Sequence, residues 1–257
     1  MFFTDTHTHI YGEEFDEDRA AVVARAIENG VTRMLLPNID MDSVEQMEQL
    51  AASNPEVFSM AMGLHPSEVY ADYRTVLNFI KGKLFDAPDK YVAVGEIGID
   101  LYWDTTFQDQ QMLVFDEQVT WAETLNKPII IHCRNGLDQI LEVLGNHGKV
   151  RGVFHCFGGT IEDIERIRQV GDFYFGIGGV ITFKKSTLPT VLATIGLERI
   201  LLETDSPYLT PTPFRGKRNE SSYIPLIAAK IAETLNVSVE AVGEQTSANA
   251  SHLFGIQ

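Results

Sequence analysis

The sequence has few of the features that mark secreted or membrane proteins. Only two of its 257 residues are cysteines, which is too few for a disulfide scaffold and typical of a reducing compartment. No apolar run reaches the ~20 residues that cross a bilayer. The N-terminal stretch MFFTDTHTHI also lacks the basic region and the apolar core of an export signal. We therefore expect a cytoplasmic protein without membrane contacts.

Positive charge is also scarce. Twenty Lys and Arg residues stand against 36 Asp and Glu residues, which gives a formal net charge of −16 at pH 7. A net negative field repels polyanions, so the total charge by itself argues against nucleic acids and anionic membranes as partners. Repeats and low-complexity segments are absent as well. With 44% hydrophobic and 22% charged residues, the composition is that of an ordinary globular protein and excludes a disordered chain.

What the sequence does contain is a regular alternation of strand-like and helical segments. Apolar runs such as PIIIH and RILLET are hydrophobic at both parities, a pattern typical of parallel strands covered by helices. Eight such units of ~30 residues predict a (β/α)8 TIM barrel of the α/β class, folded as a single domain over residues 1–257. Periodicity alone leaves an open doubly wound sheet as the alternative. The predicted strands cover residues 2–6, 31–37, 57–64, 91–97, 128–132, 152–155, 173–178 and 199–204, and the clearest helices cover residues 16–29, 106–125 and 221–235.

Five of the seven histidines lie where a predicted strand ends. In a barrel of this kind, the catalytic groups sit at the C-terminal ends of the strands, whereas the interior is packed with apolar side chains. Residues two apart on a strand face the same side, so His7 and His9 can both point into the barrel mouth. His65, His132 and His155 end three further strands. Their placement favours the barrel over the open sheet.

Four of these imidazoles and two carboxylates at other strand ends form a candidate set of metal ligands. One tetrahedral ion takes four ligands, so six ligands suit two divalent ions with a carboxylate able to bridge them. Nitrogen and oxygen ligands without a required thiolate fit Zn²⁺, Mn²⁺ or Fe²⁺, and Mg²⁺ is an alternative less expected from so many imidazoles. The candidate ligands are His7, His9, Glu96, His132, His155 and Asp205.

Two cysteines and three aromatic residues also lie beside these positions. Cys133 and Cys156 each follow a candidate ligand, and the next residue on a strand faces the opposite side. We therefore expect buried structural thiols at both positions rather than metal ligands. Tyr102, Trp103 and Phe107 follow the fourth strand and are expected to pack in the core or at the rim, with base stacking as the alternative.

At these strand ends the sequence resembles the TatD family of metal-dependent deoxyribonucleases, within the amidohydrolase-like barrels. The matching stretches are DTHTH (5–9), GLHP (63–66), VGEIGID (94–100), IHCRN (131–135), FHCFGG (154–159), ETDSPYL (203–209) and RGKRNE (215–220). They run in order over nearly the whole chain. The resemblance implies a (β/α)8 fold, hydrolysis of phosphodiester bonds, often as a 3′→5′ exonuclease on DNA, and dependence on divalent metal, commonly Mg²⁺.

The resemblance also implies how the ligands are shared between two ions. One ion would be held by His7, His9, Glu96 and Asp205, and the second by Glu96, His132 and His155. Many barrel amidohydrolases carry a carboxylated lysine at the end of the fourth strand. Here that position is Glu96, so no carboxylated lysine can form there, and this disfavours hydrolysis of cyclic amides.

Three residues are expected to act in a hydrolysis by metal-activated hydroxide. Glu96 would bridge the ions, and Asp205 would orient or deprotonate the attacking water. His65 has no place in either ligand set and could donate a proton to the leaving oxygen or bind a phosphate. Glu203 and Asp100 are candidates for carboxylates that hydrogen-bond to the ligands, and a purely structural hydrogen bond is an equal alternative.

Four cations are candidate phosphate contacts: Arg134, Arg215, Lys217 and Arg218. Arg134 lies two residues past His132, and the other three follow the eighth strand, on the expected side of the active site. A solvated charge cluster is the alternative for that loop. Together with two bound divalent ions, these cations would make the mouth locally positive despite the net charge. We therefore expect DNA strand ends or short oligonucleotides as partners and a monomer or weak oligomer.

Two alternative functions fit the same ligand set. The first is a dinuclear-metal hydrolase of amide or ester bonds, including aminoacyl esters, or of small phosphate esters. The second is a non-catalytic metal-binding barrel. The cationic loop favours a substrate that carries phosphate, and the complete ligand set argues against a scaffold without chemistry, because buried polar groups are costly.

Overall fold

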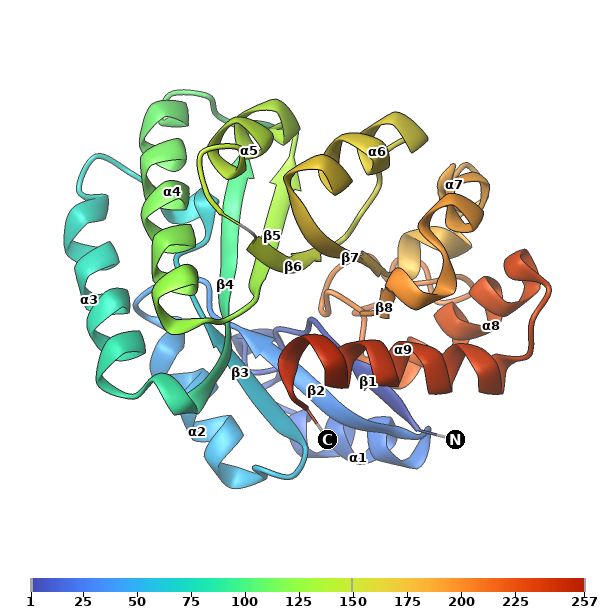
Figure 1. Cartoon of the computed structure of the whole chain (residues 1–257). Coiled ribbons are helices and arrows are strands. Elements are labelled where there is room, and N and C mark those ends of the chain that lie inside the picture. Colours follow the sequence, from blue (N-terminus) through green and yellow to red (C-terminus); the bar gives the residue numbers. More distant parts are fainter. Residues whose placement is uncertain (1, 149, 257) are drawn as a thin grey trace.

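A computed structural model describes residues 2–148 and 150–256, in which strands and α-helices alternate until two helices follow the last strand (Figure 1). The strands are β1 (Phe3–Asp5), β2 (Val31–Pro37), β3 (Phe58–Met62), β4 (Tyr91–Asp100), β5 (Ile129–Arg134), β6 (Val150–Phe154), β7 (Gly171–Ile177) and β8 (Ile200–Leu202). The α-helices are α1 (Arg19–Glu28), α2 (Ser43–Ser53), α3 (Tyr73–Asp86), α4 (Gln108–Leu125), α5 (Leu137–Leu144), α6 (Ile161–Val170), α7 (Leu188–Ile195), α8 (Ile224–Leu235) and α9 (Val239–Phe254). None of the helices in the described ranges is long and apolar enough to cross a membrane.

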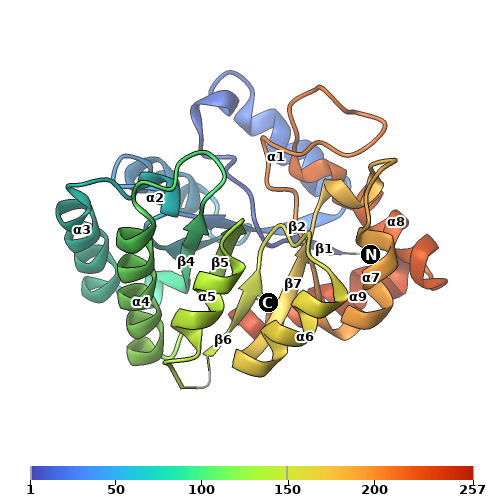
Figure 2. The ribbon, with the colours of Figure 1, turned by 90° about the horizontal axis from the view of Figure 1, so that it is seen from above.

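The eight strands form one parallel sheet in the order of the sequence, from β1 to β8. The two ends of the sheet meet, because the amide of Thr6 donates to the carbonyl of Leu202 over 2.9 Å and a parallel bridge joins Thr8 to Ser206. Figure 2 shows the helices around the outside of the strands. The (β/α)8 barrel is thereby confirmed over the open doubly wound sheet.

The interior of the barrel is filled by one small hydrophobic cluster. The strands β2 to β8 contribute one residue each: Leu35, Ala61, Ala93, Ile130, Val153, Tyr174 and Leu201. The end of α9 closes this cluster with Leu253, Phe254 and Ile256. Side chains from seven successive strands can meet in this way only on the barrel axis. A second, larger core lies between the strands and the surrounding helices.

Several element boundaries differ from those predicted. The fourth strand continues through Asp100, three residues past its predicted end. The eighth strand stops at Leu202, because the chain then turns toward the first strand and Asp205 adopts a left-handed φ of 56°. The first helix begins at Arg19 rather than at residue 16, since a short 3₁₀ turn over Glu13–Phe15 precedes it. These differences all lie at the ends of elements.

Candidate active site

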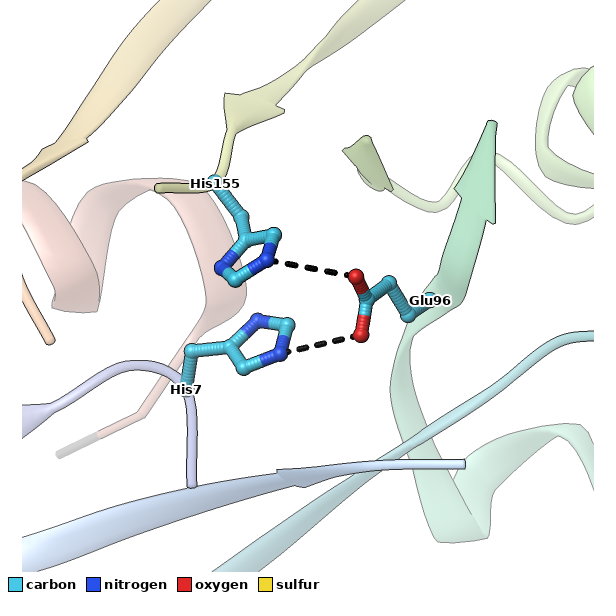
Figure 3. Close-up of side chains that lie close together, drawn as sticks. All are labelled: His7, Glu96 and His155. Carbon is cyan, nitrogen blue, oxygen red and sulfur yellow. Dashed lines mark ion pairs between the residues drawn. The ribbon is translucent and has the colours of Figure 1, made fainter. Parts of the chain in front are cut away.

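Glu96 lies at the centre of the candidate site and faces imidazoles on two sides. It is part of β4 and is only 2% exposed. Figure 3 shows His7 and His155 directed at its two different oxygens: Nε2 of His7 is 3.0 Å from Oε2, and Nε2 of His155 is 3.2 Å from Oε1. A carboxylate held between two groups of imidazoles has the arrangement that a bridging ligand requires.

The remaining predicted ligands divide between the same two sides. On the Oε2 side, Nε2 of His9 is 3.2 Å from Nε2 of His7, and both nitrogens are 3.7 Å from Oδ1 of Asp205. On the Oε1 side, Nδ1 of His132 is 2.9 Å from Glu96. Within the described residues, the groups whose ligand atoms lie within 4.8 Å of one another are His7–Glu96–His155, His7–His9–Asp205 and His65–Glu96–His132. The structure thus brings all six predicted ligands together, and His65 with them.

A tyrosine sets the protonation of His9. The single hydroxyl proton of Tyr11 is donated to the carbonyl of Pro37 over 2.6 Å, so the same oxygen must accept from Nδ1 of His9, 3.0 Å away. The proton of the neutral imidazole is therefore on Nδ1. Nε2, which faces His7 and Asp205, keeps its lone pair for a metal ion.

Carboxylates lie on both sides of two further imidazoles. Nε2 of His132 is 3.0 Å from Oδ2 of Asp100, and its Nδ1 faces Glu96. Nδ1 of His155 is 3.4 Å from Oε1 of Glu203, and its Nε2 faces Glu96. Asp100 and Glu203 therefore lie where sequence analysis expects carboxylates that orient ligands. Imidazole nitrogens and carboxylate oxygens thus converge on one site, and this donor set fits divalent ions.

His65 differs from the other imidazoles at the site. It follows β3 and begins a 3₁₀ turn, where its Nδ1 accepts from the amide of Ser67 over 3.1 Å. The proton of its neutral form is consequently on Nε2, which lies 3.3 Å from Oε1 of Glu96. His65 thus presents a hydrogen-bond donor to the site, whereas Nε2 of His9 presents a lone pair.

Burial and mutual interaction shift the acidity of the buried ligands. Burial alone would raise the pKa of Glu96, but the surrounding imidazoles outweigh it and hold this pKa well below its usual range. Burial lowers the pKa of His7 to about 4 and that of His9 well below its ordinary value. At His155, Glu96 and Glu203 outweigh burial and raise the pKa. Burial raises the pKa of Asp205 to about 7. His7 and His9 thus stay neutral, as metal ligands must.

Glycines in two strands make room for these side chains. Gly98 lies beside β5 with a φ of +148°, and a Cβ there would come within 2.0 Å of the carbonyl oxygen of His132. In β7, a Cβ on Gly176 would come within 2.1 Å of Oε2 of Glu203. Only glycine therefore lets β4 lie so close to His132 and lets Glu203 enter the barrel beneath His155.

Sequence analysis missed the residue that joins the first and last strand ends. Asp5 is fully buried and accepts from the amide and the hydroxyl of Thr204 over 3.0 and 2.6 Å, and from the amide of His7 over 3.3 Å. It thereby fixes the segment with His7 relative to the segment with Asp205. Burial raises the pKa of Asp5 to about 7. Its position two residues before His7, at the same parity as both histidines, is the signal that could have revealed it.

A cavity of about 790 Å³ opens over the ligands, a volume within the range of small-molecule sites. Its wall includes both cysteines, Cys133 and Cys156, which are only partly buried. As expected, neither cysteine belongs to the ligand groups of the described residues, and Cys133 packs against the core between the strands and the helices. Both also reach the cavity, because the chain turns at the strand ends and Cys156 has a φ of 47°. Burial raises the pKa of Cys133 to about 12 and also raises that of Cys156, which keeps both protonated.

The aromatic residues after β4 lie at the rim of the cavity rather than in the core. Trp103 is 80% exposed and lines the cavity, and Tyr102 is 51% exposed. Their rings contact each other edge to face, and Phe107 is half-buried with an edge-on contact to Tyr70. Of the two predicted places of packing, core and rim, the structure shows the rim for Tyr102 and Trp103.

The four predicted phosphate contacts do not all lie at the cavity. Arg134 lines it, with its guanidinium 3.8 Å above the ring of Tyr102. Arg215 lies 3.7 Å above the ring of Phe183, and the amino group of Lys217 is 5.6 Å from the ring of Phe214. These three form no salt bridge within the described residues.

Arg218 is engaged elsewhere. It forms a 2.8 Å ion pair with Asp18 and donates to the carbonyl of Glu14, and its guanidinium lies 4.4 Å from the ring of Phe15. These contacts tie the loop after β8 to the segment before α1, which lie side by side at the top of Figure 2. Arg218 thus has a structural role, and its predicted contact with phosphate stays a prediction.

The barrel and the ligands at its mouth define a class. A parallel (β/α)8 barrel with histidines and carboxylates gathered at its strand ends is typical of metal-dependent hydrolases. Residues 4–255 match the model of the family described as TatD related DNase, and the chain belongs to that family. It is thus a TatD-family metal-dependent hydrolase.

Relatives of known name cover almost the whole chain. An uncharacterized metal-dependent hydrolase of Bacillus subtilis, YabD, is 36% identical over 255 residues, which are 98% of each chain. A protein of Pantoea ananatis named 3′-5′ ssDNA/RNA exonuclease TatD is 32% identical and matches 98% of this chain and 99% of its own. The crystal structure of YjjV, a TatD homologue from Escherichia coli K12, superposes with a TM-score of 0.91 at 29% identity and covers 99% of this chain and 98% of its own.

Proposed function

We propose that this hydrolase cleaves phosphodiester bonds and removes nucleotides from the 3′ end of single-stranded DNA. The observation that carries the proposal is the two-sided environment of Glu96 beneath a cavity whose wall includes the cation Arg134. The exonuclease name of the Pantoea relative supports the choice of substrate. We also expect the protein to act in the cytoplasm, on strand ends rather than on long duplexes, as a monomer or weak oligomer.

The six predicted ligands would hold two divalent ions, with Mg²⁺, Zn²⁺ or Mn²⁺ as the candidates. Bound there, the ions would supply Lewis acids and a water of lowered pKa. The convergence of imidazole nitrogens and carboxylate oxygens supports this assignment. By the family resemblance, His7, His9, Glu96 and Asp205 would hold the first ion, and Glu96, His132 and His155 would hold the second.

Asp205 is the proposed acceptor for a proton of the attacking water. In the hydrolysis, the water oxygen bonds to phosphorus while the bond from phosphorus to the leaving oxygen breaks. One proton of the water passes to Asp205, whose Oδ1 lies within 3.7 Å of two ligand nitrogens. The leaving oxygen needs one proton, which Asp205 or solvent returns. The number of protons therefore balances over one turnover.

His65 stabilises negative charge rather than acting as the acid. A neutral imidazole that has its proton on Nε2 can donate a hydrogen bond, but loss of that proton would leave an anion of high energy. Of the two roles predicted for His65, the hydrogen bonds support a contact to a phosphoryl or leaving oxygen. Arg134, Arg215 and Lys217 are the proposed phosphate contacts, and Arg134 lines the same cavity as His65.

A nuclease assay with defined metal content tests the proposal. Chelator-treated protein is reloaded with Mg²⁺, Mn²⁺ or Zn²⁺ and incubated with a 5′-labelled single strand, for which we expect a ladder that shortens from the 3′ end. Asp205→Asn should lower the rate by about 10³-fold or more while the thermal unfolding stays normal. Asp86→Asn, at the exposed end of α3, is the matched control and should be fully active.

The same preparations are offered p-nitrophenyl phosphodiesters and a panel of cyclic amides and aminoacyl esters. Hydrolysis of the amides or aminoacyl esters without cleavage of DNA would favour a hydrolase of amide or ester bonds over the nuclease. Inactivity with every metal on every substrate would favour a non-catalytic metal-binding barrel. Near-normal DNA cleavage by Asp205→Asn would remove Asp205 from its proposed role.

A further inference from the structure

We propose that Trp103 is a stacking platform for one unpaired base of the substrate, with Arg134 beside it to receive a phosphate. The inference rests on the proposed nuclease function and adds to it the part of the substrate that the site recognises. It names a binding site for a nucleobase on the rim of the cavity, outside the metal ligands.

The exposure of Trp103 is the first observation. The chain has two tryptophans, and Trp121 is packed into the core at 2% exposure while Trp103 is 80% exposed. A single exposed apolar side chain is ordinary on a protein surface. Trp103, however, lines the cavity above the candidate ligands, where a bound ligand would cover it.

The platform is held in a fixed position. The rings of Tyr102 and Trp103 meet edge to face with their centroids 4.6 Å apart. The guanidinium of Arg134 lies 3.8 Å from the centroid of Tyr102 and 5.5 Å from that of Trp103. A cation over aromatic rings is attracted to their faces, so Arg134 and the two rings hold one another.

The platform is also tied to the reaction centre through one carboxylate. Oδ1 of Asp100 accepts from the amide of Tyr102 over 3.0 Å, while Oδ2 of the same side chain is 3.0 Å from Nε2 of His132. The segment with Trp103 and the ligand His132 are therefore positioned by the same residue. A base on Trp103 would be held at a fixed distance from the reacting phosphate.

A ring next to a guanidinium suits single-stranded nucleic acid. Single-strand binding proteins stack bases on aromatic rings and bind the backbone with cations, and each stacked base contributes about 1–3 kcal/mol. Inside a duplex both faces of a base are already covered by its neighbours. Trp103 can therefore receive an unpaired base but not a base inside a duplex, and a small amide or phosphate ester would leave it uncovered.

Fluorescence tests the contact directly. Metal-loaded protein is mixed in a stopped-flow instrument with single-stranded oligothymidylate, and tryptophan emission is followed before the strand is degraded. Stacking on an exposed indole should quench the wild-type signal. Trp103→Phe retains only the buried Trp121, and its signal should not change. Equal quenching in both proteins, or none in the wild type, would overturn the inference.

Abasic oligonucleotides test the role of the base in catalysis. Loss of stacking in Trp103→Ala should lower kcat/KM on single-stranded DNA by about 5- to 150-fold, and Trp103→Phe should restore most of it. Removing the base at one position near the 3′ end should lower kcat/KM by a similar factor in the wild type, but not further in Trp103→Ala. Leu113→Ala, which changes an exposed apolar residue of α4 outside the cavity, should behave as the wild type.

The two proposals fail in different ways. If the wild type cleaves no nucleic acid, the proposed function is wrong, and the fluorescence result alone decides whether Trp103 binds a base. If the wild type cleaves DNA but Trp103→Ala cleaves intact and abasic strands with unchanged rates, the nuclease stands and the stacking platform is wrong.

Discussion

The same strands carry apolar side chains at the closed end of the barrel and ionisable side chains at its mouth. On β5, Ile130 belongs to the apolar cluster inside the barrel, and two residues later His132 faces Glu96. Val153 of β6 and His155, the residue directly after β6, repeat the step. Residues two apart point to the same side of a strand, so the interior changes from apolar to ionisable within one step.

This difference separates what stabilises the protein from what it does. The closed end buries aliphatic and aromatic side chains under α9, and burial of apolar area is the main stabilising contribution to folding. The mouth buries carboxylates and several imidazoles, which lose their hydration. Neighbouring imidazoles there also disfavour one another's protonation. We therefore expect changes at the mouth to abolish activity while the fold remains, and changes at the closed end to have the reverse effect.

The sharpest change at the mouth is Glu96→Gln. It keeps the size of the side chain but removes the charge that faces imidazoles on both sides. We expect kcat to fall by about 10⁴-fold or more and the number of bound metal ions per chain to drop. The metal-free variant should still fold but be less stable than the wild type, because the change removes the charge that interacts favourably with the surrounding imidazoles. Elemental analysis and calorimetry measure both. A variant that retained two ions and measurable turnover would show that Glu96 is not the bridging ligand.

At the closed end, Phe254→Ala is the counterpart. Phe254 packs into the interior cluster, and truncation of a buried phenylalanine costs about 3–5 kcal/mol of unfolding free energy. Denaturation by urea should show this loss, while kcat/KM per folded molecule stays within about twofold of the wild type. A large fall in activity of the folded fraction would mean that the closed end and the mouth are coupled.

Tyr11→Phe sharpens the comparison within the mouth. The change removes the oxygen that accepts from Nδ1 of His9 but retains the ring. Loss of such a partner typically lowers metal affinity or activity by 10- to 100-fold, and metal titration of the variant should show it. Tyr91→Phe is the matched control, since its hydroxyl donates to Glu48 over 2.6 Å at a distance from the ligands. It should bind metal normally, and equal affinities in both variants would exclude the proposed role of Tyr11.

The sequence was sufficient to predict the barrel and the residues at its mouth for a physical reason. Parallel strands covered by helices are apolar at both parities, so a histidine that follows one of them stands out. Which nitrogen each imidazole presents could not be predicted, because it depends on atoms of other elements. The proton on His9 is set by Tyr11 and, through it, by the carbonyl of Pro37.

The side-chain directions beyond the strand ends could not be predicted either. The rule that successive side chains face opposite sides holds within a strand but not where the chain turns. This is why the cysteines were expected to face the helix layer although both line the cavity. Arg218 was expected at the substrate, whereas its partner Asp18 is 200 residues away in the sequence and is brought beside it only by closure of the barrel.

The smallest expected effect separates the two kinds of cation in the loop after β8. Arg218 pairs with Asp18 on a partly exposed surface, where such a pair contributes about 0–1 kcal/mol, so Arg218→Met should change stability slightly and leave KM for single-stranded DNA unchanged. Arg215 lies over Phe183 without a carboxylate partner in the described residues. If it contacts a phosphate, Arg215→Met should raise KM several-fold and weaken its salt dependence, because one fewer counterion is released on binding. KM measured for both variants between low and physiological salt shows which of the two arginines binds the substrate. If KM rises equally in Arg218→Met and Arg215→Met, Arg218 also contacts phosphate. If KM rises in neither variant, phosphate binding is restricted to Arg134 and Lys217.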